Sequence, residues 1–210
     1  MRILPIEPSY LEDAWTRYKK ALGNWRLVAA NLSYGLCQYV RYAMITWIPS
    51  YLYEVSGDTI FTASIKGTAF QIGGVIGSFI VGWMSDLPVL RNRRWAVIAI
   101  AMITSAVAAG AIGFAPGAWV MVALFIAGVG IESIEVAYFL IPSDFLGDDM
   151  TATGVGCMNA TGKAVASAQG VTLGAIIDKF SYSSAFVVAG AFSLLAAALV
   201  VPLRSAKWKN

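Results

Sequence analysis

Four ionisable residues stand inside long apolar stretches of this sequence, where a charge is costly. They are Arg41, Glu132, Glu135 and Lys163. At the centre of a bilayer such a charge costs about 2.5–3.5 kcal/mol on insertion scales, so it must face a protein interior or a water-filled cavity. A guanidinium stays protonated, and its planar fork fits a carboxylate or a phosphate with two parallel hydrogen bonds. We therefore predict that Arg41 anchors a small anion and that Lys163 adds a second positive charge.

Polar neighbours of these residues recur at helical spacing. The recurring positions are Asn31, Tyr34, Gln38 and Arg41 in one stretch, and Asn159, Lys163 and Ser167 in another. Residues three or four apart lie on the same side of a helix, so each set forms one polar stripe, and Glu132 and Glu135 share a face in the same way. We expect three helices to present these polar faces to one common space.

The two glutamates allow several roles. They could pair with Arg41 and Lys163 in the empty protein, carry a proton for coupling, or bind a positive group on a zwitterionic substrate. The alternative to a functional site is an internal salt-bridge network, in which two cations and two carboxylates cancel and only hold the helices together. Composition does not choose among these roles.

The elements that must position this chemistry are apolar helices. Of 210 residues, 58% are hydrophobic and 13% are charged, and the mean hydropathy is +0.68. Blocks of about 20 apolar residues match a hydrocarbon core about 30 Å thick. The blocks run from Trp25 to Tyr51, Thr62 to Trp83, Trp95 to Phe114, Trp119 to Ile141, Thr151 to Ile177 and Ala185 to Leu203. We predict an all-α membrane protein with six transmembrane helices over residues 25–204, preceded by a cytoplasmic amphipathic linker helix in residues 1–24 and followed by a basic tail in residues 205–210.

Small and basic residues refine this picture. Gly73 and Gly77 are four apart in the second block, a spacing that lets a neighbouring helix approach closely.

With six crossings both ends share one side, and only Lys66 and Lys179 fall on the opposite side. The shared side holds Arg2, Arg17, Lys19, Lys20, Arg26, Arg91, Arg93, Arg94, Arg204, Lys207 and Lys209. Because cytoplasmic loops carry the excess of basic residues, we predict that both termini are cytoplasmic.

Two motifs resemble those of a known family. The stretch from Arg41 to Leu52 begins with Arg-Tyr, in which the tyrosine is Tyr42, and ends with Trp-x-Pro-x-Tyr-Leu. It resembles the start of the second half of the organophosphate:phosphate antiporters of the major facilitator superfamily. A second stretch resembles the cytoplasmic motif of the whole superfamily. Its residues are Gly82, Asp86, Arg91, Arg93 and Arg94.

The resemblance implies that this chain corresponds to the C-terminal six of twelve helices, half of a major facilitator superfamily fold built as a 3+3 inverted repeat. It implies a substrate site at the midplane between two halves and alternating access by rocking. Gln38 and Glu132 stand where the glycerol phosphate carriers have tyrosines. A different organic anion is therefore an alternative substrate. The substrate-binding residues expected are Arg41, Lys163, Gln38, Tyr42, Glu132 and Asn159, with Glu132 and Glu135 as candidates for coupling.

The function expected is secondary transport of a small organic anion in a bacterial inner membrane, with an organophosphate exchanged for inorganic phosphate. The alternatives are a membrane sensor for a sugar phosphate and a non-functional fragment of a twelve-helix carrier. The missing N-terminal half would come from the same chain, from a second subunit or from a second copy. The chain has no histidine, and no nucleophile stands beside a base. We therefore expect no enzyme activity, no catalytic residue, no metal or cofactor, and no nucleic-acid partner.

Overall fold

The computed structural model describes residues 8–91 and 93–205, without the side chains of residues 8–12, 14, 86, 91 and 205. No strand occurs in this part of the chain, which consists of helices and their connections. The helices are α1 (Pro8–Leu22), α2 (Trp25–Glu54), α3 (Ile60–Asp86), α4 (Pro88–Arg91), α5 (Arg94–Ile112), α6 (Trp119–Ile131), α7 (Glu135–Leu146), α8 (Asp148–Ser167), α9 (Gln169–Lys179), α10 (Tyr182–Val200) and the 3₁₀ helix η1 (Val201–Ser205).

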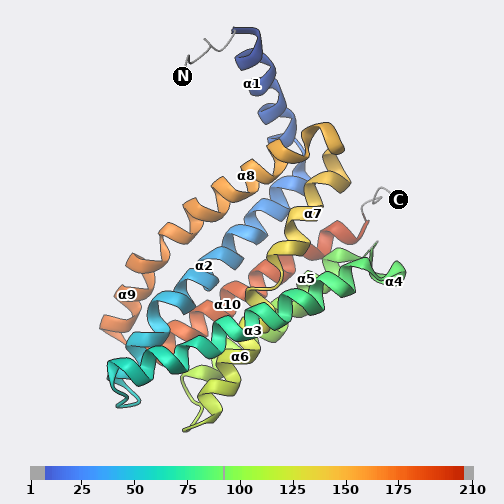
Figure 1. Cartoon of the computed structure of the whole chain (residues 1–210). Coiled ribbons are helices and arrows are strands. Elements are labelled where there is room, and N and C mark those ends of the chain that lie inside the picture. Colours follow the sequence, from blue (N-terminus) through green and yellow to red (C-terminus); the bar gives the residue numbers. More distant parts are fainter. Residues whose placement is uncertain (1–7, 92, 206–210) are drawn as a thin grey trace, which may run out of the picture.

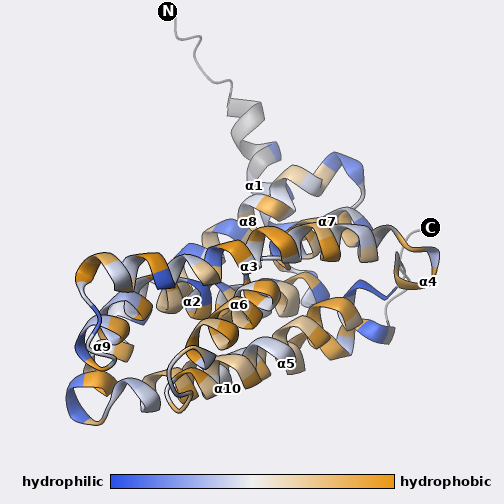
Figure 2. Cartoon of the chain, turned by 60° about the horizontal axis from the view of Figure 1, so that its bottom comes forward, coloured by the Kyte–Doolittle hydropathy of each residue, from blue (hydrophilic) through white to orange (hydrophobic). Residues whose placement is uncertain are grey.

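The chain passes back and forth along one bundle axis (Figure 1). Helices α1 and α4, the turn between α7 and α8, and η1 lie at one end of the bundle, and the α2–α3, α5–α6 and α9–α10 connections lie at the other. Figure 2 shows hydrophobic residues along the long helices and hydrophilic residues mainly near their ends and connections. The predicted all-α fold is confirmed.

Hydropathy alone finds only part of this bundle. Four segments of the described chain are long and apolar enough to cross a membrane: Ile60–Ser85, Arg94–Ile112, Trp119–Leu146 and Tyr182–Arg204. The other two passes, α2 and the α8–α9 pair, pack beside them but are too polar to qualify. Helix α2 has 30 residues, or about 45 Å at 1.5 Å per residue, which exceeds the hydrocarbon thickness. These two polar passes carry Arg41 and Lys163.

Helices α3 and α6 approach each other backbone to backbone. A Cβ added to Gly128 would lie 1.9 Å from the carbonyl oxygen of Phe70, and one added to Gly73 would lie 2.2 Å from that of Phe125. Only glycine fits such contacts, and small residues are what bring helices together in lipid, where apolar contact alone gives no advantage. The close approach predicted from the spacing of Gly73 and Gly77 is confirmed.

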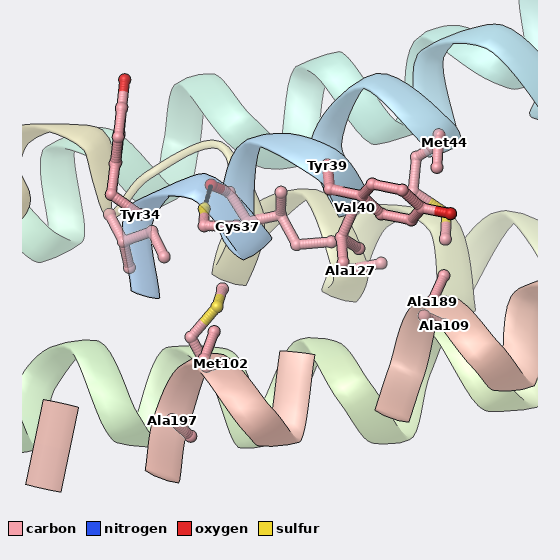
Figure 3. Close-up of a cluster of buried hydrophobic side chains, with 14 of the residues drawn as sticks. Tyr34, Cys37, Tyr39, Val40, Met44, Met102, Ala109, Ala127, Ala189 and Ala197 are labelled. Atoms are coloured by element: carbon pink, nitrogen blue, oxygen red, sulfur yellow. Dashed lines mark hydrogen bonds between the residues drawn. The ribbon is translucent and has the colours of Figure 1, made fainter. Parts of the chain in front are cut away.

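One face of α2 is fixed in the core. Val40 of α2, Met102 of α5, Ala127 of α6 and Ala189 of α10 belong to one cluster of fully buried side chains (Figure 3). Tyr34 points away from Met102 in the same view. Because the apolar side of α2 is anchored here, its polar stripe is held in a defined direction.

Two predicted continuous helices are each divided, which corrects the sequence reading. The block from Trp119 to Ile141 breaks between Ile131 and Glu135, and the block from Thr151 to Ile177 breaks at Ala168. Apolar periodicity cannot show such breaks, because the residues on both sides are equally compatible with lipid. Each break lies beside one of the polar clusters described below.

Candidate functional site

Arg41 is held by two carboxylates from the broken helix pair α6–α7. Its Nε donates to Oε1 of Glu132 at 2.8 Å, and its Nη1 donates to Oε2 of Glu135 at 3.1 Å. Glu132 follows the last residue of α6, and Glu135 is the first residue of α7. The break in the helix therefore lies where both glutamates meet the guanidinium.

Two side chains contact backbone carbonyls at this break. Ser133 Oγ donates to the carbonyls of Val129 and Gly130, the latter at 3.3 Å, and Cys37 Sγ lies 3.8 Å from the carbonyl of Ile131. In a bilayer an unpaired carbonyl costs several kcal/mol, so irregular backbone survives only where such partners exist. These side chains make the interruption stable at membrane depth.

A small residue on α3 makes room for Glu132. A Cβ on Gly74 would lie 2.4 Å from Cβ of Glu132. The glycine-rich face of α3 thus does more than allow helix packing, because it also lets this carboxylate reach Arg41.

The polar stripe of α2 extends the cluster. Tyr34 donates its hydroxyl hydrogen to Oε1 of Glu135 at 2.8 Å, and Gln38 Nε2 donates to the Tyr34 hydroxyl at 2.9 Å. Gln38 is buried, with 1% of its surface exposed. Glu135 thus receives hydrogen bonds from Arg41 on one oxygen and from Tyr34 on the other.

The cluster is not sealed. The side chains of Arg41, Glu132 and Glu135 are 23%, 10% and 32% exposed. With both carboxylates ionised the three residues carry one positive and two negative charges, so Arg41 already has its countercharges. An added anion must therefore compete with the glutamates for the guanidinium.

Lys163 lies in different surroundings. Its Nζ donates to the hydroxyl of Tyr42 at 2.5 Å and lies 4.6 Å from the centre of the Tyr42 ring. Among the described residues it forms no ion pair with a carboxylate. Lys163, Tyr42, Ser167 and Gln169 help to line an open cavity of about 290 Å³ at the α8–α9 break.

Gln169 is fixed at this cavity by two hydrogen bonds to α2. Trp47 Nε1 donates to Oε1 of Gln169 at 3.1 Å, and Gln169 Nε2 donates to Oγ1 of Thr46 at 3.3 Å. Gln169 was not among the binding residues predicted from the sequence. A glutamine inside an apolar run, six residues after Lys163, was the signal that could have found it.

The structure divides the predicted binding residues into two groups, and each group includes residues of α2. Arg41, Gln38 and Glu132 belong to the glutamate cluster, and Lys163 belongs with Tyr42. The side chain of Asn159 is partly exposed and forms no hydrogen bond within the described part of the chain. The joint anchoring of one anion by Arg41 and Lys163 stays a prediction.

The predicted cytoplasmic motif is partly described. Arg94 forms an ion pair with Asp144, which links the start of α5 to α7. Arg93 is exposed at the start of α5, and a Cβ on Gly82 would meet open space. The side chains of the other two members, Asp86 and Arg91, lie outside the described residues.

Comparison with protein families agrees with this architecture. The family model described as Major Facilitator Superfamily matches residues 30–209, most of the chain. The chain belongs to the Major Facilitator Superfamily. This superfamily match covers both polar clusters and the broken helices beside them.

Individual superfamily relatives are distant and longer. The chain is 28% identical over 173 residues to the 4-hydroxybenzoate transporter PcaK of Pseudomonas putida, covering 81% of this chain and 36% of that protein. It is 25% identical over 191 residues to the probable galactarate/D-glucarate transporter GudP of Escherichia coli, covering 87% and 42%. It is 24% identical over 179 residues to the membrane sensor protein UhpC of Escherichia coli, covering 84% and 41%. The matched part thus spans about two fifths of the length of these relatives.

Proposed function

We propose that this chain works as half of a secondary carrier that moves a small organic anion by alternating access. The observation that supports the proposal is the partly exposed Arg41 at membrane depth, held by two glutamates at a helix break. Membership of the Major Facilitator Superfamily gives the general class, a membrane protein that handles small solutes. In carriers of this kind, broken helices at the midplane form the binding site.

A second half is part of the proposal, because one six-helix half cannot enclose a pore. It would come from the same longer chain, from a separate subunit or from a second copy of this chain. A second copy related by an axis along the membrane normal would place two Arg41 side chains opposite each other, as the halves of complete carriers are related.

Two substrate classes compete for this site. The motif that begins at Arg41 favours an organophosphate exchanged for inorganic phosphate. The pairing of Arg41 with Glu132 and Glu135 disfavours a phosphate dianion, since two carboxylates would repel it. The relatives PcaK and GudP are named for carboxylates, which supports a carboxylate as the second candidate.

The proposed location is a bacterial inner membrane, with both termini in the cytoplasm. The support is the excess of basic residues on one side, together with the position of α1, α4 and η1 at the same end of the bundle (Figure 1).

Uptake by proteoliposomes tests the carrier function. Reconstituted with its second half, the protein should accumulate labelled glycerol 3-phosphate or labelled 4-hydroxybenzoate. Arg41→Ala and Arg41→Lys should both lose most of this uptake, because a lysine cannot keep both glutamates in place. The exposed Lys179→Gln is the control and should retain uptake. Full uptake by both Arg41 variants, or uptake of neither solute class by the wild type, would contradict the proposal.

A membrane sensor is the second candidate function, supported by the similarity to UhpC. A sensor would bind the solute with the same dependence on Arg41 but would show no counterflow in vesicles. Binding without counterflow would favour the sensor, and counterflow would exclude a purely sensory role.

A further inference from the structure

The two cations at membrane depth differ in what they have left to offer a ligand. Arg41 donates to two carboxylates, whereas Lys163 donates to a neutral tyrosine hydroxyl and has no carboxylate partner within the described chain. The charge still free for an anion is therefore on Lys163. The sequence suggested Arg41 as the main anchor and Lys163 as a second charge, whereas the partners of the two cations favour the opposite order.

The Arg41 cluster offers a different kind of contact. Ionised carboxylates are acceptors only, with about four lone-pair positions each, and Arg41 and Tyr34 occupy a few of these on Glu132 and Glu135. The remaining positions accept hydrogen bonds from hydroxyl groups but repel a second carboxylate. Polar groups of this kind recognise a hydroxylated part of a ligand.

The two groups lie side by side on α2. Arg41 and Tyr42 are consecutive, so their Cα atoms are about 3.8 Å apart and their side chains diverge by about 100° around the helix. Gln38 lies one turn earlier beneath both, and a Cβ on Gly162, the neighbour of Lys163, would lie 3.2 Å from Gln38 Cγ. A ligand that contacts both groups must therefore span about one turn of α2.

We propose that the substrate is a hydroxylated monocarboxylic acid, whose carboxylate binds Lys163 in the cavity beside Tyr42 and whose hydroxyl groups bind Glu132 and Glu135. The inference rests on the carrier function proposed above and assigns its substrate class. The cavity of about 290 Å³ admits a carboxylate, and Ser167 and Gln169 supply polar groups on its wall. The ammonium group of Lys163 lies over the face of the Tyr42 ring, a cation–π contact that stabilises its charge.

Three six-carbon probes separate the two contacts: gluconate has a carboxylate and hydroxyls, hexanoate lacks the hydroxyls, and sorbitol lacks the carboxylate. Dissociation constants for the purified protein in nanodiscs should be lowest for gluconate. A parallel set for an aromatic substrate is 4-hydroxybenzoate, benzoate and 4-hydroxybenzyl alcohol. At least one hydroxy acid should bind more tightly than both of its partners by about tenfold, the value of a hydrogen bond to a charged group.

Variants assign each contact. Lys163→Gln should bind the hydroxy acid about 10–100-fold more weakly, with a dissociation constant close to that of the alcohol. The variant should still bind the hydroxy acid more tightly than the unhydroxylated acid. Glu132→Gln with Glu135→Gln should do the opposite, removing the preference for hydroxyls and leaving the preference for the carboxylate. Lys179→Gln, which also removes an exposed lysine from the α8–α9 pair, should change neither ratio.

Several results would overturn this inference. Loss of the carboxylate preference in Arg41→Gln but not in Lys163→Gln would show that Arg41, and not Lys163, binds the carboxylate. Tight binding of glycerol 3-phosphate without binding of either hydroxy acid would reject the substrate class and leave the carrier function standing. Binding and uptake of neither phosphates nor carboxylates would reject both.

Discussion

Two helix pairs in this bundle pack closely but for different purposes. Helices α3 and α6 meet through backbone atoms at Gly73 and Gly128, where a Cβ on either glycine would meet the backbone of the other helix. Helices α2 and α8 meet through side chains, with Gly162 against the ring of Tyr34, and both Tyr34 and Gln38 of the α2 polar stripe are buried there. The α3–α6 pair is a scaffold that places Glu132, whereas the α2–α8 pair carries the cations. Stability should therefore depend most on the first pair and solute binding on the second.

The largest effect on stability should come from Gly128→Ala. The new methyl group would collide with the Phe70 carbonyl, a backbone atom that cannot move aside, so we expect a loss of about 3 kcal/mol or more. The melting temperature of the purified protein in detergent checks this. Gly110→Ala is the matched control, because a Cβ there meets open space and alanine favours the helix. Equal melting temperatures for the two variants would show that the α3–α6 contact is not the scaffold.

An intermediate effect should come from removing the countercharges of Arg41. Glu132→Gln with Glu135→Gln leaves the guanidinium unpaired at membrane depth, and because its side chain is partly exposed we expect a loss of about 1–3 kcal/mol. Adding Arg41→Gln to that double variant should restore much of the stability, since no unpaired charge is left. If the triple variant is less stable than the double variant, the glutamates do not serve as countercharges in the resting protein.

The smallest effect on stability should come from Lys163→Gln. Lys163 is exposed and contacts only a neutral partner among the described groups, so the free energy of unfolding should change by no more than about 0.5 kcal/mol. The melting temperature of the variant checks this. Binding of a hydroxy acid should fall in the same variant. A large loss of stability would place Lys163 in the structural framework and weaken its assignment to the ligand.

The sequence predicted the helices better than the site. Long apolar runs and the Gly73–Gly77 spacing were sufficient for the bundle, because lipid demands length and close packing demands small residues. The polar stripe through Gln38 and Arg41 was also visible from spacing alone. Hydropathy overlooks α2, because the same stripe that carries function lowers its apolarity.

Pairing could not be predicted in the same way. Both Arg41 and Lys163 lie near the middle of their segments. Only the tertiary arrangement shows that Glu132 and Glu135 form ion pairs with Arg41 and not with Lys163. The helix break after Ile131 was hidden for a similar reason, since its unpaired carbonyls are satisfied by Ser133 and by Cys37 from another helix. Contacts between distant segments have no local signal.

The most direct test of the account is whether water reaches the polar face of α2 and α8. In a protein with Cys37→Ala and Cys157→Ala, Lys163→Cys and Val107→Cys are compared for reaction with a membrane-impermeant thiol reagent in proteoliposomes. Val107 lines an apolar groove on α5 and serves as the lipid-facing reference. We expect rapid labelling at position 163 and little labelling at position 107. Equal, negligible labelling at both positions would contradict it, because a site closed to water cannot receive a solute.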